Sequence, residues 1–378
     1  NSKPWLLPLL LAGIAVAPRA AKRFEFEIPE WMLFRSWIYL AVALALMAAW
    51  IFVANLGRRW RVPVVNELVV GVCLLATAVG LTWNARQSWG EPVYRHRNFY
   101  GALTVNENEL NPNTQYMELM HGRITHGNQL KTRANVRYTP TTYYNETSGA
   151  GIILKSMPSL THAPLRVGAV GLGVGTLSAY AKMGDSFHFY EINPAVIELA
   201  QSRPNPWFDY VPHAQGIGAE VVITQGDARL SLERELAQGH PGRYDVILVD
   251  AFNGDSIPIH LLTVEAMEIY LKHLRTQDSV IALHISNRSV DLQKIAAGLA
   301  QRLNLYATMI TSEEEDSLNL KSDWVLLSRN KSFMNLPEVR AVGVSLISPK
   351  DFFRPPPPAP VWTDDFSNVW QVLDLKGD

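Results

Sequence analysis

The sequence contains almost no cysteine. Its one cysteine, Cys73, lies within an apolar run, so the chain can form no intrachain disulfide and has no thiolate set for a structural zinc ion. We expect Cys73 to be a small buried side chain, and we expect no bound metal.

Charged residues of both signs are also scarce. Asp, Glu, Lys and Arg make up 18% of the 378 residues, against about 25% in an average globular protein. The formal net charge is −1, which gives no overall basic character for nucleic acid. The shortage of charge indicates that part of the chain avoids water, and we expect no nucleic-acid partner.

The long apolar runs of the chain lie within residues 1–90. Residues 31–56 carry one charge, Arg35, and residues 64–83 form a second apolar run. As helices these runs would be about 39 Å and about 30 Å long, enough to cross a bilayer. We predict two transmembrane helices here; the alternative is a pair of buried core helices in a soluble protein.

A third apolar run, residues 5–17, contains Pro8 and is too short to cross a bilayer by itself. It lacks the basic start and the cleavage site of a signal peptide. We expect it to be a partial helix, the end of a helix that begins further upstream in a longer polytopic protein.

The pattern changes after residue 90. Residues 91–163 hold short alternating apolar segments broken by Asn, Gly and Pro, typical of a small strand-rich domain. From residue 164 to 378, apolar runs alternate with helix-like segments, which predicts a mostly parallel sheet covered on both faces. The expected strands lie at 166–170, 187–191, 220–224, 244–249 and 279–285. We therefore expect an α/β fold with a Rossmann-like sheet of the class I methyltransferase type.

Two later segments extend this expectation. The runs 305–310 and 324–328 are predicted to pair as an antiparallel edge of the sheet. The tail 361–373 is too apolar for a disordered end, so we expect it to dock on the domain.

A glycine turn follows the first expected strand, with Gly171, Gly173 and Gly175. Glycines let the backbone turn tightly and approach a ligand closely, and the next helix offers free N–H groups. The second strand ends at Glu191, where an acid holds a ribose diol through charge-assisted hydrogen bonds. A glycine turn alone is weak evidence for a ligand site, and Glu191 at the end of the second strand strengthens that evidence.

The next two strands also end in acids. The third runs into Gly226, Asp227 and Ala228, and the fourth ends at Asp250. An Asp at the third strand can accept a hydrogen bond from an adenine amino group, and open α/β sheets bind ligands at this edge. The chain has no GxxxxGK[ST] and no G-x-S-x-G motif, which argues against nucleotide hydrolases and esterases. The pattern predicts a nucleoside site.

Taken together, these segments resemble the spermidine synthases (polyamine aminopropyltransferases), most closely their membrane-fused bacterial branch, the fused transporter/spermidine-synthase proteins. The resemblance covers roughly residues 95–330. The stretches that carry it are HGRITHGNQ, PTTYYNETSGAGI, RVGAVGLGVGTL, FYEINPAVIELA, GDARLSL and YDVILVDAFNGDSIPIHLLT.

The resemblance implies roles for matching positions. Glu191 would hold the ribose and Asp227 the adenine end, while Asp250 stands where the family has the Asp that deprotonates and orients the attacking amine. Tyr144 and Glu146 match the Tyr and Glu of a Tyr-His-Glu segment that lines the amine pocket. A protonated amine is no nucleophile, which explains the need for a positioned base.

Several positions depart from the family pattern. Val174 replaces an Asp of the glycine turn, and Asn253 replaces a second Asp after the fourth strand. Asn145 stands for the His of Tyr-His-Glu, and Gly101, after Tyr100, stands for a Gln. Each change removes a charge or a polar group from the place where a diamine should bind, so the resemblance supports the nucleoside half of the site better than the acceptor half.

Other polar residues are candidates for the acceptor half. We include Asp255, His121 and Gln129 as substrate-binding residues. His126 and His284 fall in the same regions, and a histidine near pH 7 can act as a base.

The resulting hypothesis is a membrane-anchored transferase that binds decarboxylated or intact S-adenosylmethionine and transfers an aminopropyl group to an amine or another small nucleophile. No metal is needed, because the sulfonium carbon is already activated. The alternatives are a methyltransferase that uses intact S-adenosylmethionine and a non-catalytic nucleoside sensor coupled to the membrane segment. We expect a multi-pass protein of the bacterial inner (cytoplasmic) membrane with a cytoplasmic soluble domain, and the small strand-rich domain is a candidate homodimer surface.

Overall fold

The computed structural model describes residues 92–122, 124–131, 134–201, 207–250, 258–287, 290–346 and 359–372. The predicted helices 31–56 and 64–83 and the partial helix 5–17 lie outside these residues, as do Cys73, Asn253 and Asp255. Among the residues that the structure describes, no helix combines the length and apolar character needed to cross a bilayer.

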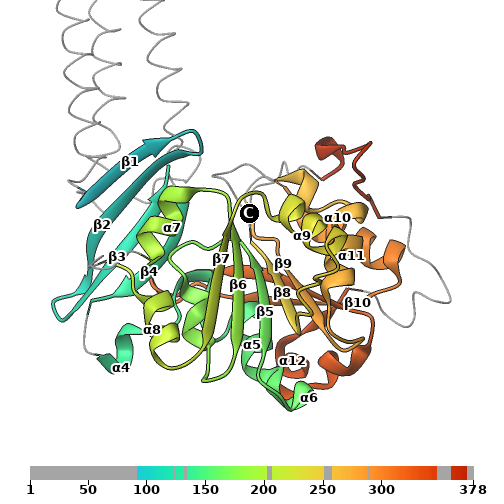
Figure 1. Cartoon of the computed structure of the whole chain (residues 1–378), viewed down its shortest axis with the longest axis horizontal. Helices are drawn as coiled ribbons and strands as arrows, with labels where there is room; N and C mark the ends of the chain where they lie inside the picture. Colours follow the sequence, from blue (N-terminus) through green and yellow to red (C-terminus); the bar gives the residue numbers. More distant parts are fainter. Residues whose placement is uncertain are drawn as a thin grey trace, which may run out of the picture. The chain divides into compact units, whose positions relative to one another are not determined.

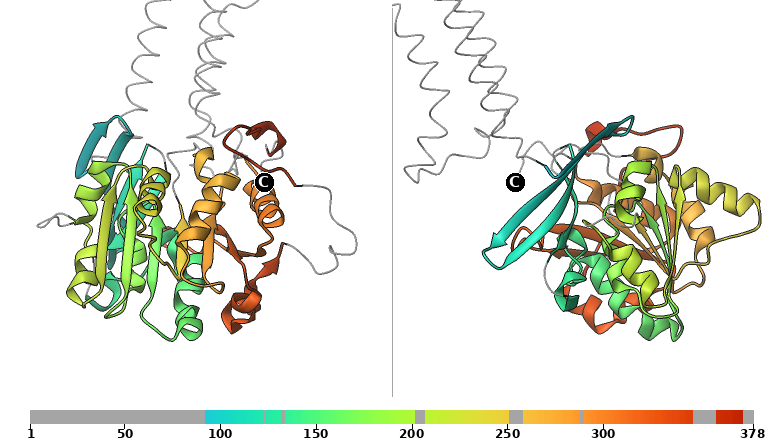
Figure 2. Two further views of the ribbon diagram at one scale, coloured as in Figure 1. Left: turned by 45° about the vertical axis from the view of Figure 1, so that its right-hand side comes forward. Right: turned by 60° about the vertical axis from the view of Figure 1, so that its left-hand side comes forward.

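A small antiparallel sheet comes first in the described chain (Figure 2). Its strands, in spatial order, are β1 (Tyr94–Asn98), β2 (Gly101–Asn111), β3 (Thr114–His121) and β4 (Ile124–Leu130). Leu103, Val105 and Leu119 are fully buried on one face, as the two-residue period of a strand requires. These side chains share one hydrophobic core with the larger sheet, so the two sheets form one compact unit.

The larger sheet has the strand order β12-β10-β11-β9-β8-β5-β6-β7. Its strands β5 to β9 are labelled in Figure 1. The strands are β5 (Arg166–Val170), β6 (Ser186–Glu191), β7 (Glu220–Gln225), β8 (Val246–Val249), β9 (Val280–His284), β10 (Tyr306–Ser312), β11 (Ser322–Ser328) and β12 (Val344–Ser345). β5 to β9 are mutually parallel, whereas β11 runs antiparallel to both of its neighbours. Apart from the short β12, this is the arrangement of a class I methyltransferase-like α/β sheet, the expected fold class.

The predicted antiparallel pair is present at one side of this sheet: β10 and β11 pair antiparallel, and β11 lies between β9 and β10. The outer edge is β12, which pairs with β10. The physical reason is visible in the side chains of β11: Trp324, Val325, Leu326 and Leu327 are fully buried, and a continuous apolar run buried on both faces suits a central strand.

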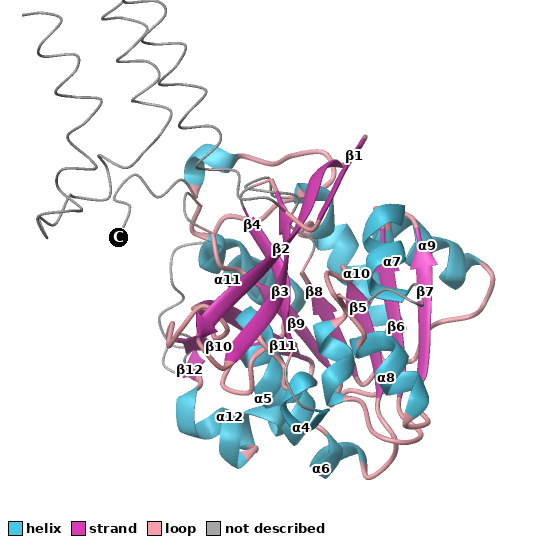
Figure 3. Ribbon diagram, turned by 90° about the vertical axis from the view of Figure 1, so that its left-hand side faces the viewer, coloured by secondary structure: helices cyan, strands magenta, loops and turns pink. Residues whose placement is uncertain are grey.

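Helices cover both faces of the larger sheet (Figure 3). One face packs against the small sheet and against α5 (Gly149–Ser156), α7 (Pro194–Gln201), α8 (Tyr210–Gly216) and α12 (Pro337–Val342). The other face packs against α9 (Ala228–Ala237), α10 (Val264–His273) and α11 (Leu292–Leu303). The remaining short helices are α4 (Ala134–Arg137), α6 (Pro158–Thr161), η2 (Thr142–Tyr144), η3 (Thr176–Tyr180), η4 (Ile259–Leu261), η5 (Lys331–Asn335) and η7 (Val369–Gln371).

The described part of the tail, residues 359–372, packs on the face formed by α9, α10 and α11. Trp362 and Val372 are fully buried there, and the Trp362 carbonyl accepts a hydrogen bond from the Val264 N–H at 2.9 Å. Arg229 of α9 holds Asp364 through both guanidinium nitrogens. The tail therefore completes the core on this side.

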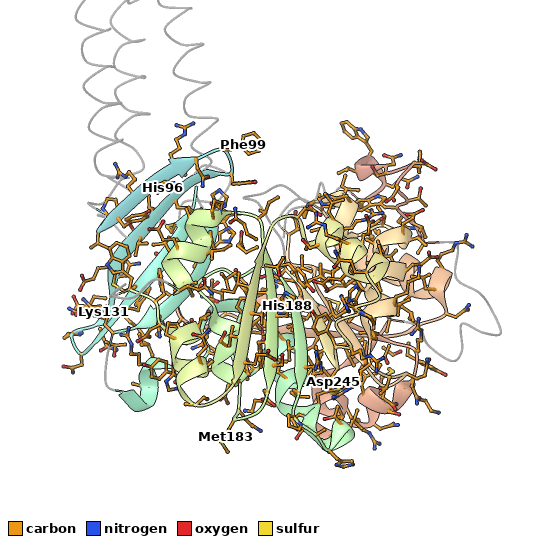
Figure 4. The ribbon with its side chains drawn as sticks, viewed as in Figure 1. His96, Phe99, Lys131, Met183, His188 and Asp245 are labelled. Atoms are coloured by element: carbon orange, nitrogen blue, oxygen red, sulfur yellow. The ribbon has the colours of Figure 1, made fainter. Side chains whose placement is uncertain are left out.

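The two ends of β8 carry acids with different environments. Asp245, at the amino end (Figure 4), accepts hydrogen bonds from the Arg166 N–H at 2.9 Å and from Arg275 at 3.0 Å. This acid fastens β8 to its neighbours. Asp250, at the carboxyl end, lies at the edge where parallel sheets bind ligands.

Candidate active site

A cavity of about 280 Å³ opens at the carboxyl ends of β5, β6, β7 and β8. Eight of the predicted site residues line it, and they come from both halves of the predicted site. The nucleoside half contributes Gly171, Gly173, Glu191, Asp227 and Ala228; the acceptor half contributes Asp250, Tyr144 and His121. The structure thus brings together residues that lie more than 100 positions apart in the chain, such as Tyr144 and Asp250.

The glycine turn allows close contact between the two sheets at the cavity. Gly173 has a φ of +55°, and a Cβ atom built there would lie 2.5 Å from the backbone oxygen of His126 in β4. A side chain at this position would push β4 away. Gly175 instead packs against Val211, where a Cβ atom would meet a methyl carbon at 2.7 Å, and it does not line the cavity.

Glu191 is fixed by the backbone around it. Its Oε2 accepts the Leu172 N–H at 3.0 Å, and its Oε1 accepts the Asn193 N–H at 2.7 Å. Burial raises the pKa of Glu191, although these backbone hydrogen bonds act in the opposite direction. A carboxylate held in this way keeps spare lone pairs that can accept hydroxyl hydrogens of a ribose.

Asp227 has two contacts at the next strand end. Its Oδ1 accepts the Leu230 N–H at 2.9 Å and so caps α9. Its Oδ2 lies 2.9 Å from Nε2 of His260, which also lines the cavity. The cap fixes the carboxylate, and its other oxygen faces a hydrogen-bonding partner at the adenine end of the predicted site.

Asp250 is the centre of a buried hydrogen-bond network. The Tyr144 hydroxyl donates to Oδ2 of Asp250, and Nδ1 of His284 donates to Oδ1 at 2.7 Å. The His284 ring lies between the rings of Tyr143 and Trp324, with ring centroids 4.8 Å and 4.7 Å away and nearly parallel planes. Both oxygens of Asp250 are therefore engaged, and the groups that engage them are themselves held in place.

The network also sets the charge of Asp250. Burial by itself would raise the pKa of Asp250, but the charge of His284 and the hydrogen bonds from His284 and Tyr144 outweigh it, so the pKa is lowered. Burial and the negative charge of Asp250 raise the pKa of Tyr144 well above its usual value. At neutral pH the site therefore holds an ionised Asp250 and a neutral Tyr144.

The acceptor side of the cavity is formed by aromatic and imidazole rings. Nε2 of His121 donates to the Tyr100 carbonyl at 2.7 Å. A Cβ atom at Gly101, which has a φ of +130°, would lie 2.1 Å from that same nitrogen. The ring of His121 thus occupies the space of a side chain at residue 101, where the resemblance leads us to expect a Gln.

Val174 takes no part in the cavity. Its side chain is 1% exposed, and a Cβ atom at Gly127 of β4 would lie 2.5 Å from one of its methyl carbons. At the position where the resemblance places an acid, this chain therefore has an apolar contact between the glycine turn and the small sheet.

Besides Gly175, two predicted residues lie away from the cavity, and one more is not described. Glu146 forms an exposed ion pair with Lys155 at 2.7 Å. The preceding Asn145 accepts the N–H groups of Thr147 and Ser148, and the resulting turn carries Glu146 outward. Asp255 lies outside the described residues.

Gln129 makes a buried contact outside the cavity. Its side chain is fully buried, its Nε2 donates to Asp209 at 2.7 Å, and its Oε1 accepts the Asp209 N–H at 2.8 Å. This pair joins β4 to the start of α8 and does not line the cavity.

Tyr143, Asn193 and His260 also line the cavity and were not among the predicted site residues. Asn193 could have been identified from the sequence, because an Asn directly before Pro194 marks the start of a helix. In the structure its Oδ1 accepts the Ala195 N–H at 3.1 Å. His260 and Tyr143 could not have been identified in this way, since their positions depend on tertiary packing.

Within the described ranges, no group of three or more His, Cys, Asp or Glu side chains is arranged to hold a metal ion. Several ionisable groups around the cavity instead form hydrogen bonds with one another or with the backbone.

Comparison with known proteins gives a partial match. No family model matches the chain. A polyamine aminopropyltransferase from Vibrio vulnificus (strain CMCP6) is 33% identical over 129 residues, which cover 33% of this chain and 39% of the relative. The match therefore spans about two fifths of the length of that curated relative.

Two solved structures from other bacteria have a partly similar backbone. A probable spermidine synthase from Corynebacterium glutamicum ATCC 13032 has a TM-score of 0.49 and 14% identity, covering 73% of this chain and 98% of that one. The O-methyltransferase TomG from Streptomyces achromogenes has a TM-score of 0.31 and 17% identity, covering 48% of this chain and 81% of that one.

Proposed function

We propose that this chain is a polyamine aminopropyltransferase-like enzyme. It binds decarboxylated S-adenosylmethionine and transfers the aminopropyl group to an amine acceptor. The observation that carries the proposal is the ionised Asp250, held by Tyr144 and His284 in the cavity that also contains Glu191 and Asp227. The sequence similarity to the Vibrio vulnificus aminopropyltransferase supports the same reading.

The nucleoside half of the cavity would bind the adenosine part of the substrate. Glu191, fixed by two backbone N–H groups, would accept the ribose hydroxyls. Asp227 and His260 would contact the adenine end. The glycine turn would lie against the substrate without side chains in the way, which leaves the sulfonium group directed toward Asp250.

The acceptor half would position the amine for attack. The nitrogen lone pair of the amine forms a bond to the propyl carbon next to sulfur, the C–S bond breaks, and its electron pair stays on sulfur in methylthioadenosine. The charged sulfonium makes that carbon electrophilic, so the protein needs to supply orientation and a proton acceptor. The anionic Asp250 would attract the cationic acceptor into place.

A second candidate is methyl transfer from intact S-adenosylmethionine. The buried Val174 favours it, because an acid at that position would attract the aminopropyl amine of the decarboxylated substrate and would repel the carboxylate of the intact one. This chain has only apolar contacts there, so the position itself presents no repulsion to the intact form.

Binding and product analysis test the proposal together. The purified chain would be titrated calorimetrically with S-adenosylmethionine, its decarboxylated form and methylthioadenosine, and then incubated with a panel of amines. Preference for the decarboxylated form and release of methylthioadenosine would support aminopropyl transfer. Release of S-adenosylhomocysteine would support the second candidate, and binding of neither sulfonium would refute both. Glu146→Gln is a matched control for acid substitutions, since Glu146 is exposed outside the cavity.

We also propose that the apolar runs 31–56 and 64–83 anchor the enzyme in the bacterial inner membrane with its soluble part in the cytoplasm. Their length and low charge support this placement. Extraction of the expressed chain from membranes by carbonate at high pH would contradict it, whereas extraction only by detergent is the expected result.

A further inference from the structure

His260 lines the cavity beside Asp227, in the short helix η4. Its Nε2 atom lies 2.9 Å from Oδ2 of Asp227. A carboxylate oxygen accepts hydrogen bonds and cannot donate them, so the hydrogen between these two atoms belongs to the imidazole. In the neutral ring the other nitrogen, Nδ1, then carries a lone pair. The pair therefore offers two hydrogen-bond acceptors, the carboxylate and Nδ1.

Arg229 ties the backbone of His260 to helix α9. Nη1 of Arg229, two positions after Asp227, donates to the His260 carbonyl at 3.0 Å and to the Thr263 hydroxyl at 3.3 Å. The His260 side chain is 51% exposed, whereas the Arg229 side chain is only 13% exposed. The half-exposed imidazole is thus held in place by a largely buried guanidinium group.

The C-terminal tail in turn holds Arg229. Oδ1 of Asp364 accepts hydrogen bonds from Nη1 of Arg229 at 2.6 Å and from the Thr263 hydroxyl at 2.9 Å, and Oδ2 accepts from Nη2 of Arg229. Hydrogen bonding to Arg229 lowers the pKa of Asp364, so the pair is ionised at neutral pH and its hydrogen bonds are charge-assisted. A continuous series of contacts therefore runs from the tail through Arg229 and His260 to Asp227.

The acceptors at this end of the cavity suit one class of purine. The 6-amino group of adenine carries two N–H hydrogens, whereas a 6-oxo purine has an oxygen acceptor at the same position. A site built to hydrogen-bond an amino group disfavours an analogue that lacks its hydrogens, because acceptors then face one another. If His260 were displaced, Asp227 alone would make this distinction.

We propose that Arg229 and Asp364 are positioning residues, which hold His260 beside Asp227 so that the site selects a 6-aminopurine nucleoside. The inference rests on the proposed function, which puts the adenine of the substrate at this end of the cavity. It gives the docked tail a part in substrate recognition, although the tail lies on the face formed by α9, α10 and α11.

The test uses the whole chain and calorimetric Kd values for methylthioadenosine and for methylthioinosine, its 6-oxo analogue. The readout is the ratio of the two Kd values, because a loss of stability alone would not change which base is preferred. His260→Ala and Asp364→Ala are each expected to lower this ratio by roughly 2- to 10-fold, the effect of losing one neutral hydrogen bond. The change should come mainly from weaker binding of methylthioadenosine.

The chain offers two matched controls. Asp365→Ala removes the next acid of the tail, which is exposed. Glu233→Ala removes another partner of Arg229, at 3.0 Å on the same helix, that has no place in the series of contacts to His260. Both variants should keep the wild-type ratio. In a His260→Ala background, Asp364→Ala should leave the ratio unchanged, because a residue that acts through His260 has no effect without it.

The outcomes separate this role from the proposed function. A wild-type ratio in either single variant, additive effects in the double variant, or an equal loss in the Asp365→Ala and Glu233→Ala controls overturns the inference. Equal binding of the two nucleosides by the wild-type chain also overturns it. All of these results leave the proposed function in place. If the wild-type chain binds neither nucleoside and neither form of S-adenosylmethionine, the proposed function falls and this role falls with it.

Discussion

Substitution of Gly101 by Ala tests the arrangement on the acceptor side of the cavity. The added Cβ atom would lie 2.1 Å from Nε2 of His121, a distance at which the atoms cannot coexist. The His121 ring must move, and its hydrogen bond to the Tyr100 carbonyl is lost. The backbone must also keep a φ of +130°, a conformation that alanine rarely adopts.

The cost can be estimated from these two effects. Holding a non-glycine residue in such a conformation costs about 1–3 kcal/mol. Loss of a partly buried hydrogen bond costs about 0.5–1.5 kcal/mol. We therefore expect Gly101→Ala to lower the free energy of unfolding by about 2–4 kcal/mol.

Chemical denaturation provides the assay, and the chain offers a matched control. Gly122 has a φ of +62° and nothing within 4 Å of its hypothetical Cβ, so Gly122→Ala should cost only about 1–2 kcal/mol of backbone strain. In a His121→Ala background the cost of Gly101→Ala should fall by about 1 kcal/mol, since the crowded ring is gone. If Gly101→Ala lowered the free energy of unfolding equally in both backgrounds, the His121 ring would not be occupying the space of a side chain at residue 101.

Three other predictions concern the acids of the cavity. Asp250→Asn should lower kcat by roughly 10²- to 10⁴-fold in a turnover assay with methylthioadenosine affinity largely kept, because the anion positions the acceptor; unchanged turnover would show that Asp250 has no role in the reaction. Glu191→Ala should weaken methylthioadenosine binding by roughly 10- to 10²-fold, the effect of losing hydrogen bonds to a charged group, and an unaltered Kd in calorimetry would contradict the ribose assignment. Because the pKa of Asp250 is lowered in the folded chain, its ionised form stabilises the fold above the unfolded carboxyl pKa of about 3.9, and this contribution disappears as the pH falls through the folded pKa. Asp250→Asn should therefore lose less unfolding free energy than the wild type as the pH falls from about 5 to below the folded pKa, which itself lies below about 3.9, and equal losses in acid titrations monitored by denaturation would count against it.

The parallel part of the sheet could be predicted from the sequence because its central strands β5, β8 and β9 are buried on both faces. The run 166–170 coincides with β5, and such continuous apolar runs differ clearly from their surroundings. β8 begins at Val246 and not at Tyr244, the predicted start. Tyr244 makes an isolated bridge to Leu274, and the Asp245 carboxylate accepts the Arg166 N–H. These contacts depend on the folded neighbours, and no sequence pattern reports them.

The gathering of Glu191 and Asp227 at one edge of the sheet was predictable for a related reason. Glu191 and Asp227 stand directly at strand ends, and the ends of parallel strands meet at one edge. The acceptor half is built from η2, β4 and the end of β9, which are far apart in the chain. Its geometry depends on contacts such as that between His121 and Gly101. Glu146 matched a family motif, yet the turn around Asn145 directs it to solvent.

The position of β11 inside the sheet has a consequence for how the chain emerges during synthesis. β10 is made before β11, but its partners among the described strands, β11 and β12, both follow it in the sequence. Until β11 is complete, the edge of β9 therefore has no hydrogen-bonded strand on that side. The apolar side chains of β10 likewise have no neighbouring strand beside which they can pack. Unpaired strand edges are templates for association with other chains. Until Ser328 has been added, a nascent copy therefore carries strand edges that can associate with other chains.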